Sequence, residues 1–253
     1  MGLTLAAPIP ATTLANARLA GDESLAVFKV LLAAVARPGK PVALPCDLVA
    51  TLPRALLAPL GLVDLDHVFA VLGDDLAEND CDGVADVADN DCDGVADVGW
   101  VSLIAAATAA RPTDVLDDAD VVIARRSPTA EEIGALRRGS ALLPEAGARL
   151  FIACRAVTTP GPDTQQSESE SIQFRVSGPG ASIPRVVEIT GISSDVPAAI
   201  ADANSAFPTG IDVWFIDDAG TVVGVPRSSS IDTQIPRISA GRTTGHASTK
   251  GGN

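Results

Sequence analysis

Apolar side chains in the first half of the chain recur at spacings that predict helices alternating with short strands. Between residues 25 and 36, Phe28, Leu31, Leu32 and Val35 fall three or four positions apart and therefore share one face of a helix. The Arg-Pro-Gly sequence that follows ends this helix, because proline disfavours helical geometry in the residue before it. Similar spacings and stop signals predict helices over 48–60, 100–110 and 129–138. Short apolar runs predict strands over 42–44, 63–72 and 121–124.

Short runs of β-branched and other apolar residues dominate the second half of the chain and predict strands. Residues 158–171 contain no apolar side chain other than proline, so we expect a flexible hairpin loop between the strands on either side. The Gly178-Pro179-Gly180 sequence predicts a tight turn with at least one glycine at positive φ. The predicted strands of this half are 149–157, 172–176, 186–192, 211–216 and 221–225, of which the last two form a hairpin.

The order of these elements predicts one α/β domain with a mixed sheet flanked by helices. We place this domain at residues 1–236, with residues 74–98 as an acidic insertion. Residues 237–253 are rich in Ser, Thr and Gly, and we expect them to form a disordered tail.

Composition and charge narrow the functional classes. With 47% hydrophobic and 20% charged residues among 253, the chain can bury a core. Its net charge of −14 would repel a polyanion, and six Phe, two Trp and no Tyr offer few surfaces for base stacking, so we exclude nucleic acid as a partner. No apolar run approaches the ~18 residues of a membrane span, and no basic segment precedes the short apolar run near the N-terminus. We therefore expect a cytoplasmic protein that does not enter a membrane.

The cysteines and histidines do not occur at spacings that predict a catalytic or zinc site. The four cysteines form no Cys-x-x-Cys or Cys/His motif, so we expect reduced thiols. One histidine lies within the predicted strand 63–72 and the other in the tail, and neither has a partner at catalytic spacing. We therefore predict no catalytic residue, no metal site and no cofactor. The residues considered are Cys46, Cys81, Cys92, Cys154, His67 and His246.

A tandem repeat gives the insertion its acidic character. Residues 79–87 recur unchanged as residues 90–98, and residues 74–97 carry ten carboxylates with no Lys or Arg. A frame beginning at Glu78 places oxygen ligands and a central glycine as a calcium loop does, but the overlapping second frame has Trp100 where the last carboxylate should stand. We favour a solvated acidic loop left by a duplication, with a calcium-binding module as the alternative that calorimetry would reveal. The candidate calcium ligands are Glu78, Asp80, Asp82, Asp86 and Asp89.

Five segments, taken in order, resemble the H subunit family of the bacterial carbon-phosphorus lyase system, PhnH. We call them the signature segments. Each alone is a weak signal, but their order along residues 25–231 is specific, although Gly180-Ala181 stands where the family more often has Gly-Ile. The signature segments are the helix and Arg-Pro-Gly turn of 28–39, Leu-Pro-Glu-Ala-Gly-Ala at 143–148, Ser-Gly-Pro-Gly at 177–180, Phe-Pro-Thr-Gly-Ile-Asp at 207–212 and Val-Pro-Arg-Ser-Ser at 225–229.

The resemblance implies a role in phosphonate utilisation, within a core complex that also contains the G, I and J subunits. That machinery displaces adenine from MgATP with an alkylphosphonate, which gives a ribose 1-phosphonate 5-triphosphate before the carbon-phosphorus bond is cleaved. The resemblance further implies a homodimer before assembly, a subunit that is not itself catalytic, and a fold similar to pyridoxal-phosphate transferases without the cofactor.

The positions of the lysines indicate whether the chain could bind pyridoxal phosphate covalently. A pyridoxal enzyme needs a lysine for its Schiff base, and the chain has only Lys29, Lys40 and Lys250, none of which follows a strand in a Ser-x-x-Lys context. A stand-alone pyridoxal-phosphate-type or other small-molecule enzyme is the alternative function. An absorbance band of the Schiff base, lost on substitution of Lys29 or Lys40, would favour that alternative.

Overall fold

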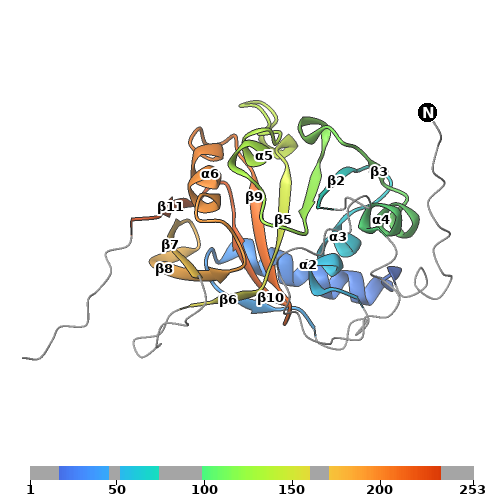
Figure 1. Cartoon of the computed structure of the whole chain (residues 1–253), viewed down its shortest axis with the longest axis horizontal. Coiled ribbons are helices and arrows are strands. Elements are labelled where there is room, and N and C mark those ends of the chain that lie inside the picture. Colours follow the sequence, from blue (N-terminus) through green and yellow to red (C-terminus); the bar gives the residue numbers. More distant parts are fainter. Residues whose placement is uncertain (1–16, 46–51, 74–98, 160–170, 235–253) are drawn as a thin grey trace, which may run out of the picture.

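A seven-stranded mixed sheet forms the centre of the computed structural model, which describes residues 17–45, 52–73, 99–159 and 171–234 (Figure 1). The strand order is β1-β10-β9-β5-β4-β2-β3. Strands β9, β5, β4, β2 and β3 run parallel, whereas β10 and β1 continue the sheet antiparallel beyond β9. The strands are β1 (Val42–Ala43), β2 (Val68–Leu72), β3 (Arg111–Pro112), β4 (Val121–Ala124), β5 (Arg149–Cys154), β9 (Asp212–Asp217) and β10 (Thr221–Val225).

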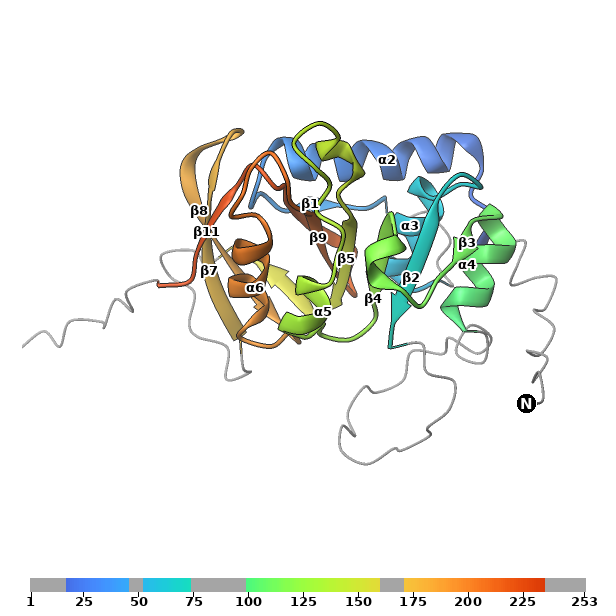
Figure 2. The same cartoon turned by 90° about the horizontal axis from the view of Figure 1, so that it is seen from above.

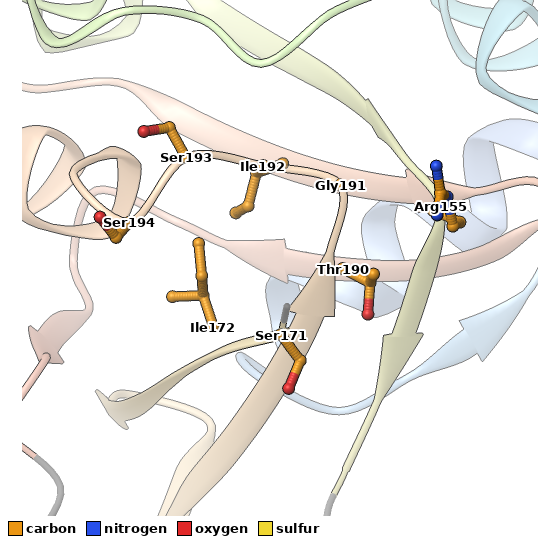
Figure 3. Close-up of a pocket in the computed structure, with 8 residues that line it drawn as sticks. All are labelled: Arg155, Ser171, Ile172, Thr190, Gly191, Ile192, Ser193 and Ser194. Carbon is orange, nitrogen blue, oxygen red and sulfur yellow. The ribbon is translucent and has the colours of Figure 1, made fainter. Parts of the chain in front are cut away.

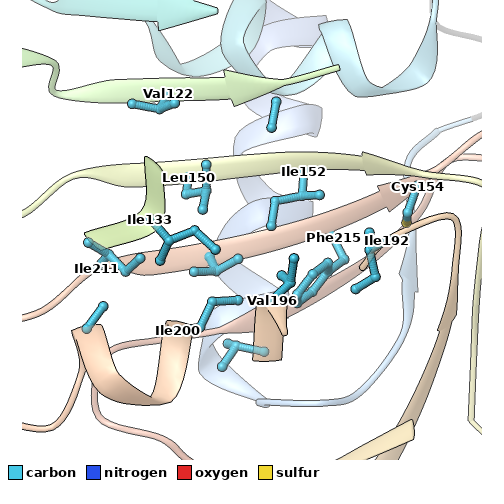
Figure 4. Close-up of a cluster of buried hydrophobic side chains, with 14 of the residues drawn as sticks. Val122, Ile133, Leu150, Ile152, Cys154, Ile192, Val196, Ile200, Ile211 and Phe215 are labelled. Carbon is cyan, nitrogen blue, oxygen red and sulfur yellow. The ribbon is translucent and has the colours of Figure 1, made fainter. Parts of the chain in front are cut away.

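The central strands are buried on both faces, which explains why they are apolar without alternation. Along β4, Val121 and Ile123 belong to one hydrophobic core, whereas Val122 and Ala124 belong to the other. Successive side chains of a strand point to opposite faces, so one apolar run supplies both cores. Figure 4 shows the second core, in which side chains of β4, β5 and β9 face two helices.

Three helices cover the first face of the sheet. Helix α2 buries Val27, Leu31 and Ala34 in the first core. The indole Nε1 of Trp214 on β9 donates a hydrogen bond to the Leu31 carbonyl at 3.0 Å, which fixes α2 on the sheet. In Figure 2, α2 lies on one side of β5 and β9 and α6 on the other. The helices of the first face are α2 (Gly21–Ala36), α3 (Arg54–Leu62) and α4 (Trp100–Thr108).

Two helices and a four-stranded antiparallel sheet cover the second face. The chain enters this second sheet directly, because β6 follows β5 after the single residue Arg155. The strand order is β11-β7-β8-β6, and the Gly178-Pro179-Gly180 turn joins β7 to β8. These elements are α5 (Ala130–Gly134), α6 (Val196–Ala203), β6 (Ala156–Thr158), β7 (Ser171–Gly178), β8 (Ala181–Thr190) and β11 (Ser230–Asp232), while short 3-10 helices span Leu116–Asp118 and Pro144–Ala146.

The structure confirms the predicted class, a mixed α/β fold with a mixed sheet flanked by helices. The predicted turn at 178–180 is also confirmed, with Gly178 at φ 138° and Gly180 at φ 82°. The prediction of a hairpin around residues 158–171 is wrong, because β6 and β7 do not pair with each other and instead flank β8 on opposite sides. The acidic insertion, the predicted tail and the N-terminal residues 1–16 lie outside the described residues. Within the described part of the chain, no helix has the length and hydropathy needed to cross a bilayer.

Several predicted boundaries shift for physical reasons. The predicted strand 63–72 begins only at Val68, because Asp64 to His67 form a turn closed by a hydrogen bond from the His67 amide to the Asp64 carbonyl. The helix predicted over 129–138 ends at Gly134, and its Thr129 cap and Glu132 form a capping box. Helix α6 and strand β11 were not predicted. Both are short, and β11 lies in a polar stretch that a sequence pattern does not mark.

Candidate functional site

The two edges of the parallel sheet are built differently, and the signature segments meet at the amino edge. Arg227 follows β10 and Asp212 begins β9, and the two side chains form a bidentate ion pair in which Arg227 Nη2 donates to Asp212 Oδ2 at 2.6 Å. The Asp212 carboxylate also accepts a hydrogen bond from the Arg227 amide at 2.9 Å. Arg227 Nη1 donates to the Pro144 carbonyl. One arginine therefore joins three of the five signature segments.

The other two signature segments contact these three through close backbone approaches at glycine residues. A Cβ at Gly180 would lie 2.2 Å from the Ala36 carbonyl oxygen at the end of α2, and a Cβ at Gly178 would lie 2.9 Å from the Ser228 carbonyl oxygen. The Gly39 amide donates to the Gly224 carbonyl at 3.1 Å, which ties the Arg-Pro-Gly turn to β10. All five signature segments thus form one contact network.

A hollow of about 360 Å³ opens beside this network, which we call the amino-edge hollow. Among the described residues that line it, Asp212 is the one with a charge, and its carboxylate is already held by Arg227. Leu32 of α2 also lines it and is 53% exposed. The remaining walls include Val35, Pro179, Trp214, Pro226 and Ser228.

At the opposite edge, the strands end in charged residues. Arg125 and Arg126 follow β4, Arg155 follows β5, and Asp218 follows β9. These four residues line a hollow of about 230 Å³ together with Ala153, Cys154 and Gly191. Arg155 and Gly191 also line a neighbouring hollow of about 550 Å³, which Figure 3 shows between the end of β8 and the 191–194 loop. We call the two hollows together the carboxyl-edge groove.

The loops that border the carboxyl-edge groove are fixed by hydrogen bonds. The Arg155 amide donates to the Thr190 carbonyl at 2.9 Å, and the Ser193 amide donates to the Ser127 hydroxyl at 2.8 Å. The second bond connects the loop after β8 to the loop after β4. The loops on two sides of the groove are therefore connected to neighbouring strands or loops.

The charges of the carboxyl-edge groove influence one another. Arg126 forms a bidentate pair with Glu132, and the hydrogen bonds from its guanidinium lower the pKa of that carboxyl. Burial raises the pKa of the Asp218 carboxyl and the Asp217 carboxylate adds to this rise, whereas Arg155 opposes it. Burial likewise raises the pKa of the Cys154 thiol far above its ordinary range, so this cysteine stays protonated and unreactive.

Comparison with protein families identifies the family of this chain. The family model described as bacterial phosphonate metabolism protein (PhnH) matches residues 20–232. The chain belongs to the PhnH family. The match includes all five signature segments, which confirms the resemblance seen in the sequence and makes this a phosphonate metabolism protein. No curated protein matches the chain.

Among the described residues that the sequence singled out for possible chemistry, Cys154 lines the carboxyl-edge groove of this PhnH family fold, and the others line neither that groove nor the amino-edge hollow. Lys29 and Lys40 are exposed, on α2 and just after Gly39, and line neither the amino-edge hollow nor the carboxyl-edge groove. His67 lies in the turn before β2 and not within the strand, and its Nδ1 is 2.7 Å from an Asp64 carboxylate oxygen. Outside the described residues lie Lys250, His246, Cys46, Cys81, Cys92 and the calcium candidates Glu78, Asp80, Asp82, Asp86 and Asp89.

Sequence reasoning missed the arginines of the carboxyl-edge groove. Arg125 and Arg126 stand directly after a buried strand, so the rule that parallel strands end at a common edge could have placed them there. Arg155 was hidden inside the predicted strand 149–157, which the structure divides into β5 and β6 at this residue. Recognising that break required knowledge of the second sheet.

Proposed function

We propose that this protein is a subunit of the bacterial carbon-phosphorus lyase core complex. In this proposal it associates with the G, I and J subunits and supports transfer of a phosphonate onto the ribose of ATP, which forms ribose 1-phosphonate 5-triphosphate. Membership of the PhnH family over residues 20–232 is the observation that carries the proposal. We further propose that residues 1–236 form one domain, that the chain acts in the cytoplasm, and that it forms a homodimer before assembly.

Exposed apolar side chains support a protein that works in an assembly. Leu25, Phe28 and Leu32 project from one side of α2 and are 50%, 44% and 53% exposed. Their spacing of three and four residues puts them on one helical stripe next to the amino-edge hollow. Large apolar side chains grouped on a surface mark contact with a partner more often than isolated ones do.

Co-purification tests this proposal. The tagged full chain, expressed with the G, I and J subunits, should recover all three in a stable complex. Phe28→Asp combined with Leu32→Asp should reduce recovery of the other subunits while leaving the melting temperature of the isolated chain close to that of the parent, because both side chains are exposed.

The matched control is Leu65→Asp, which changes a 65% exposed leucine in the turn before β2 and should leave recovery unchanged. If the G, I and J subunits assemble fully without this chain and do not bind it when it is folded, the proposal is wrong. The alternative of a pyridoxal-phosphate-type enzyme gains no support from the geometry, since Lys29 and Lys40 are exposed outside both candidate sites.

A further inference from the structure

We propose that the carboxyl-edge groove binds a small molecule through its phosphoryl or phosphonyl group. The smaller hollow, lined by Arg125, Arg126 and Arg155, takes the charged group, and the larger hollow takes the uncharged part of the ligand. This inference goes beyond membership of a complex, because it gives this chain a ligand of its own.

The topology puts the groove where open parallel sheets bind ligands. From the end of β2 the chain returns through α4, which packs in the first core, and from the end of β4 it returns through α5, which packs in the second core. The two connections leave neighbouring strands toward opposite faces of the sheet, so the strand order reverses between β2 and β4. The groove lies beside this switch point, at the carboxyl ends of β4, β5 and β9, and open α/β sheets bind their ligands outside the carboxyl ends of the strands near such a point.

The charge of the smaller hollow suits a tetrahedral oxyanion. Three arginines and one aspartate line it, although the whole chain has a net charge of −14. Arg126 already gives both terminal nitrogens to Glu132, and the Arg125 guanidinium carbon lies 4.9 Å from the ring centroid of Trp100. We therefore assign the charged group of the ligand to the exposed Arg155 guanidinium, whose planar fork of N–H donors matches two oxygens of a phosphoryl or phosphonyl group.

Glycine keeps the space beside Arg155 available. Gly191 lines both hollows and has φ 91°, a conformation that other residues rarely adopt. A Cβ at this position would lie 3.0 Å from the Arg155 amide nitrogen and 3.2 Å from its Cβ. A larger residue here would therefore press on the arginine that connects the two hollows.

The lining of the larger hollow is neutral and polar. Beyond Arg155 it consists of Gly191, two isoleucines and four hydroxyl-bearing residues, and Figure 3 shows these side chains around the opening. Hydroxyls can donate to or accept from the hydroxyl groups of a ligand, and isoleucine can contact its carbon atoms. The hydroxyl-bearing residues are Ser171, Thr190, Ser193 and Ser194.

Calorimetric titration of the full chain at low salt tests the inference, with inorganic phosphate and methylphosphonate as the two probes. We expect saturable binding of at least one probe, and the preferred probe identifies the class of ligand. Arg155→Gln should weaken that binding by about tenfold or more, as expected for loss of a charged hydrogen bond. Asp218→Asn should strengthen it, because a competing carboxylate is removed from the same hollow.

The matched control is Arg111→Gln, which removes the same charge from an exposed residue of β3 that pairs with Val68 at the amino end of β2. It should leave binding unchanged. If neither probe binds saturably, or if Arg155→Gln and Arg111→Gln weaken binding equally, the inference is wrong. Arg155→Gln should still co-purify with the G, I and J subunits, so a failure here is separate from a failure of the proposed function.

Discussion

The amino and carboxyl edges of the same sheet use arginine in opposite ways. At the amino edge, the Arg227 side chain is 13% exposed and is held by Asp212 and the Pro144 carbonyl. At the carboxyl edge, Arg155 is exposed between two hollows of about 230 and 550 Å³. The first arginine is paired within the fold, whereas the second lines open space. The residues that identify the family therefore stabilise the fold, and the residues that could meet a ligand lie elsewhere.

Close packing explains why the signature segments are so specific in sequence. At the amino edge a Cβ on Gly147 would lie 2.2 Å from the Gly210 carbonyl oxygen, and the Gly210 amide donates to the Arg138 carbonyl at 2.8 Å. Backbone atoms approach one another at distances that leave no room for a side chain. Motifs of this kind follow from geometry and need no ligand to account for them.

The largest expected effect is a change at Gly180. Gly180→Ala places a Cβ 2.2 Å from the Ala36 carbonyl oxygen and forces a side chain onto φ 82°. The strained conformation and the overlap together should lower the free energy of unfolding by about 2–4 kcal/mol. Denaturant unfolding of parent and variant measures the loss.

Gly134→Ala is the control, because a Cβ on Gly134 at the end of α5 meets no atom within 4 Å. Removing glycine from a helix should raise the free energy of unfolding by about 0.5–1 kcal/mol. Equal stability of the two alanine variants would mean that the contact between the β7–β8 turn and α2 does not form.

A smaller loss is expected on breaking the central pair of the amino edge. Arg227→Leu leaves the Asp212 carboxylate, which is 24% exposed, without its bidentate partner and removes the donor to the Pro144 carbonyl. The free energy of unfolding should fall by about 2–3 kcal/mol, toward the lower end for a pair that is not fully buried. Arg227→Lys should recover less than half of this loss, since an ammonium cannot form the planar two-point contact.

The comparison is sharpened by Arg155→Leu, which should change stability by less than about 0.5 kcal/mol because Arg155 is exposed. Denaturant unfolding of the Arg227 and Arg155 variants side by side gives the difference directly. A loss at Arg155 as large as the loss at Arg227 would contradict the division of the two edges into a packed and an open one.

The sequence predicted most helices and strands, but it did not predict which residues meet at either edge of the sheet. Apolar runs such as 121–124 and 211–216 mark buried strands because both faces are covered. The helix over 25–36 was predicted from a stripe of which only Leu31 is buried, whereas Phe28 and Leu32 are exposed. The edges depend on contacts between distant segments, as when Arg227 meets Pro144, and no local pattern records such a pair. Helix α6 was missed for a related reason, since its eight residues are fixed by packing against the second core.

The last expected effect is also small and concerns the pH dependence of stability at the carboxyl edge. The folded chain raises the pKa of Asp218 above its ordinary value of 3.8, mainly through burial. Ionising this carboxyl therefore costs more free energy in the folded chain than in the unfolded one. At pH values above the folded pKa, this cost lowers the free energy of unfolding. Asp218→Asn removes the penalty, so the variant should be more stable than the parent at pH 7, by less than about 1 kcal/mol because solvent screens a partly exposed group.

The advantage of Asp218→Asn should shrink as the pH falls through the folded pKa and disappear below 3.8, where the carboxyl is protonated in both states. Glu132→Gln should show the opposite sign, because hydrogen bonds from Arg126 lower the pKa of Glu132 below its ordinary 4.5. That variant should be less stable than the parent at pH 7, with the difference vanishing as the pH falls below the folded pKa of Glu132. Thermal melts of the parent and both variants between pH 7 and pH 3 measure the two trends. If Asp218→Asn were less stable than the parent at pH 7, the carboxyl edge would hold Asp218 as firmly as the amino edge holds Asp212, and the contrast between the two edges would fail at this residue.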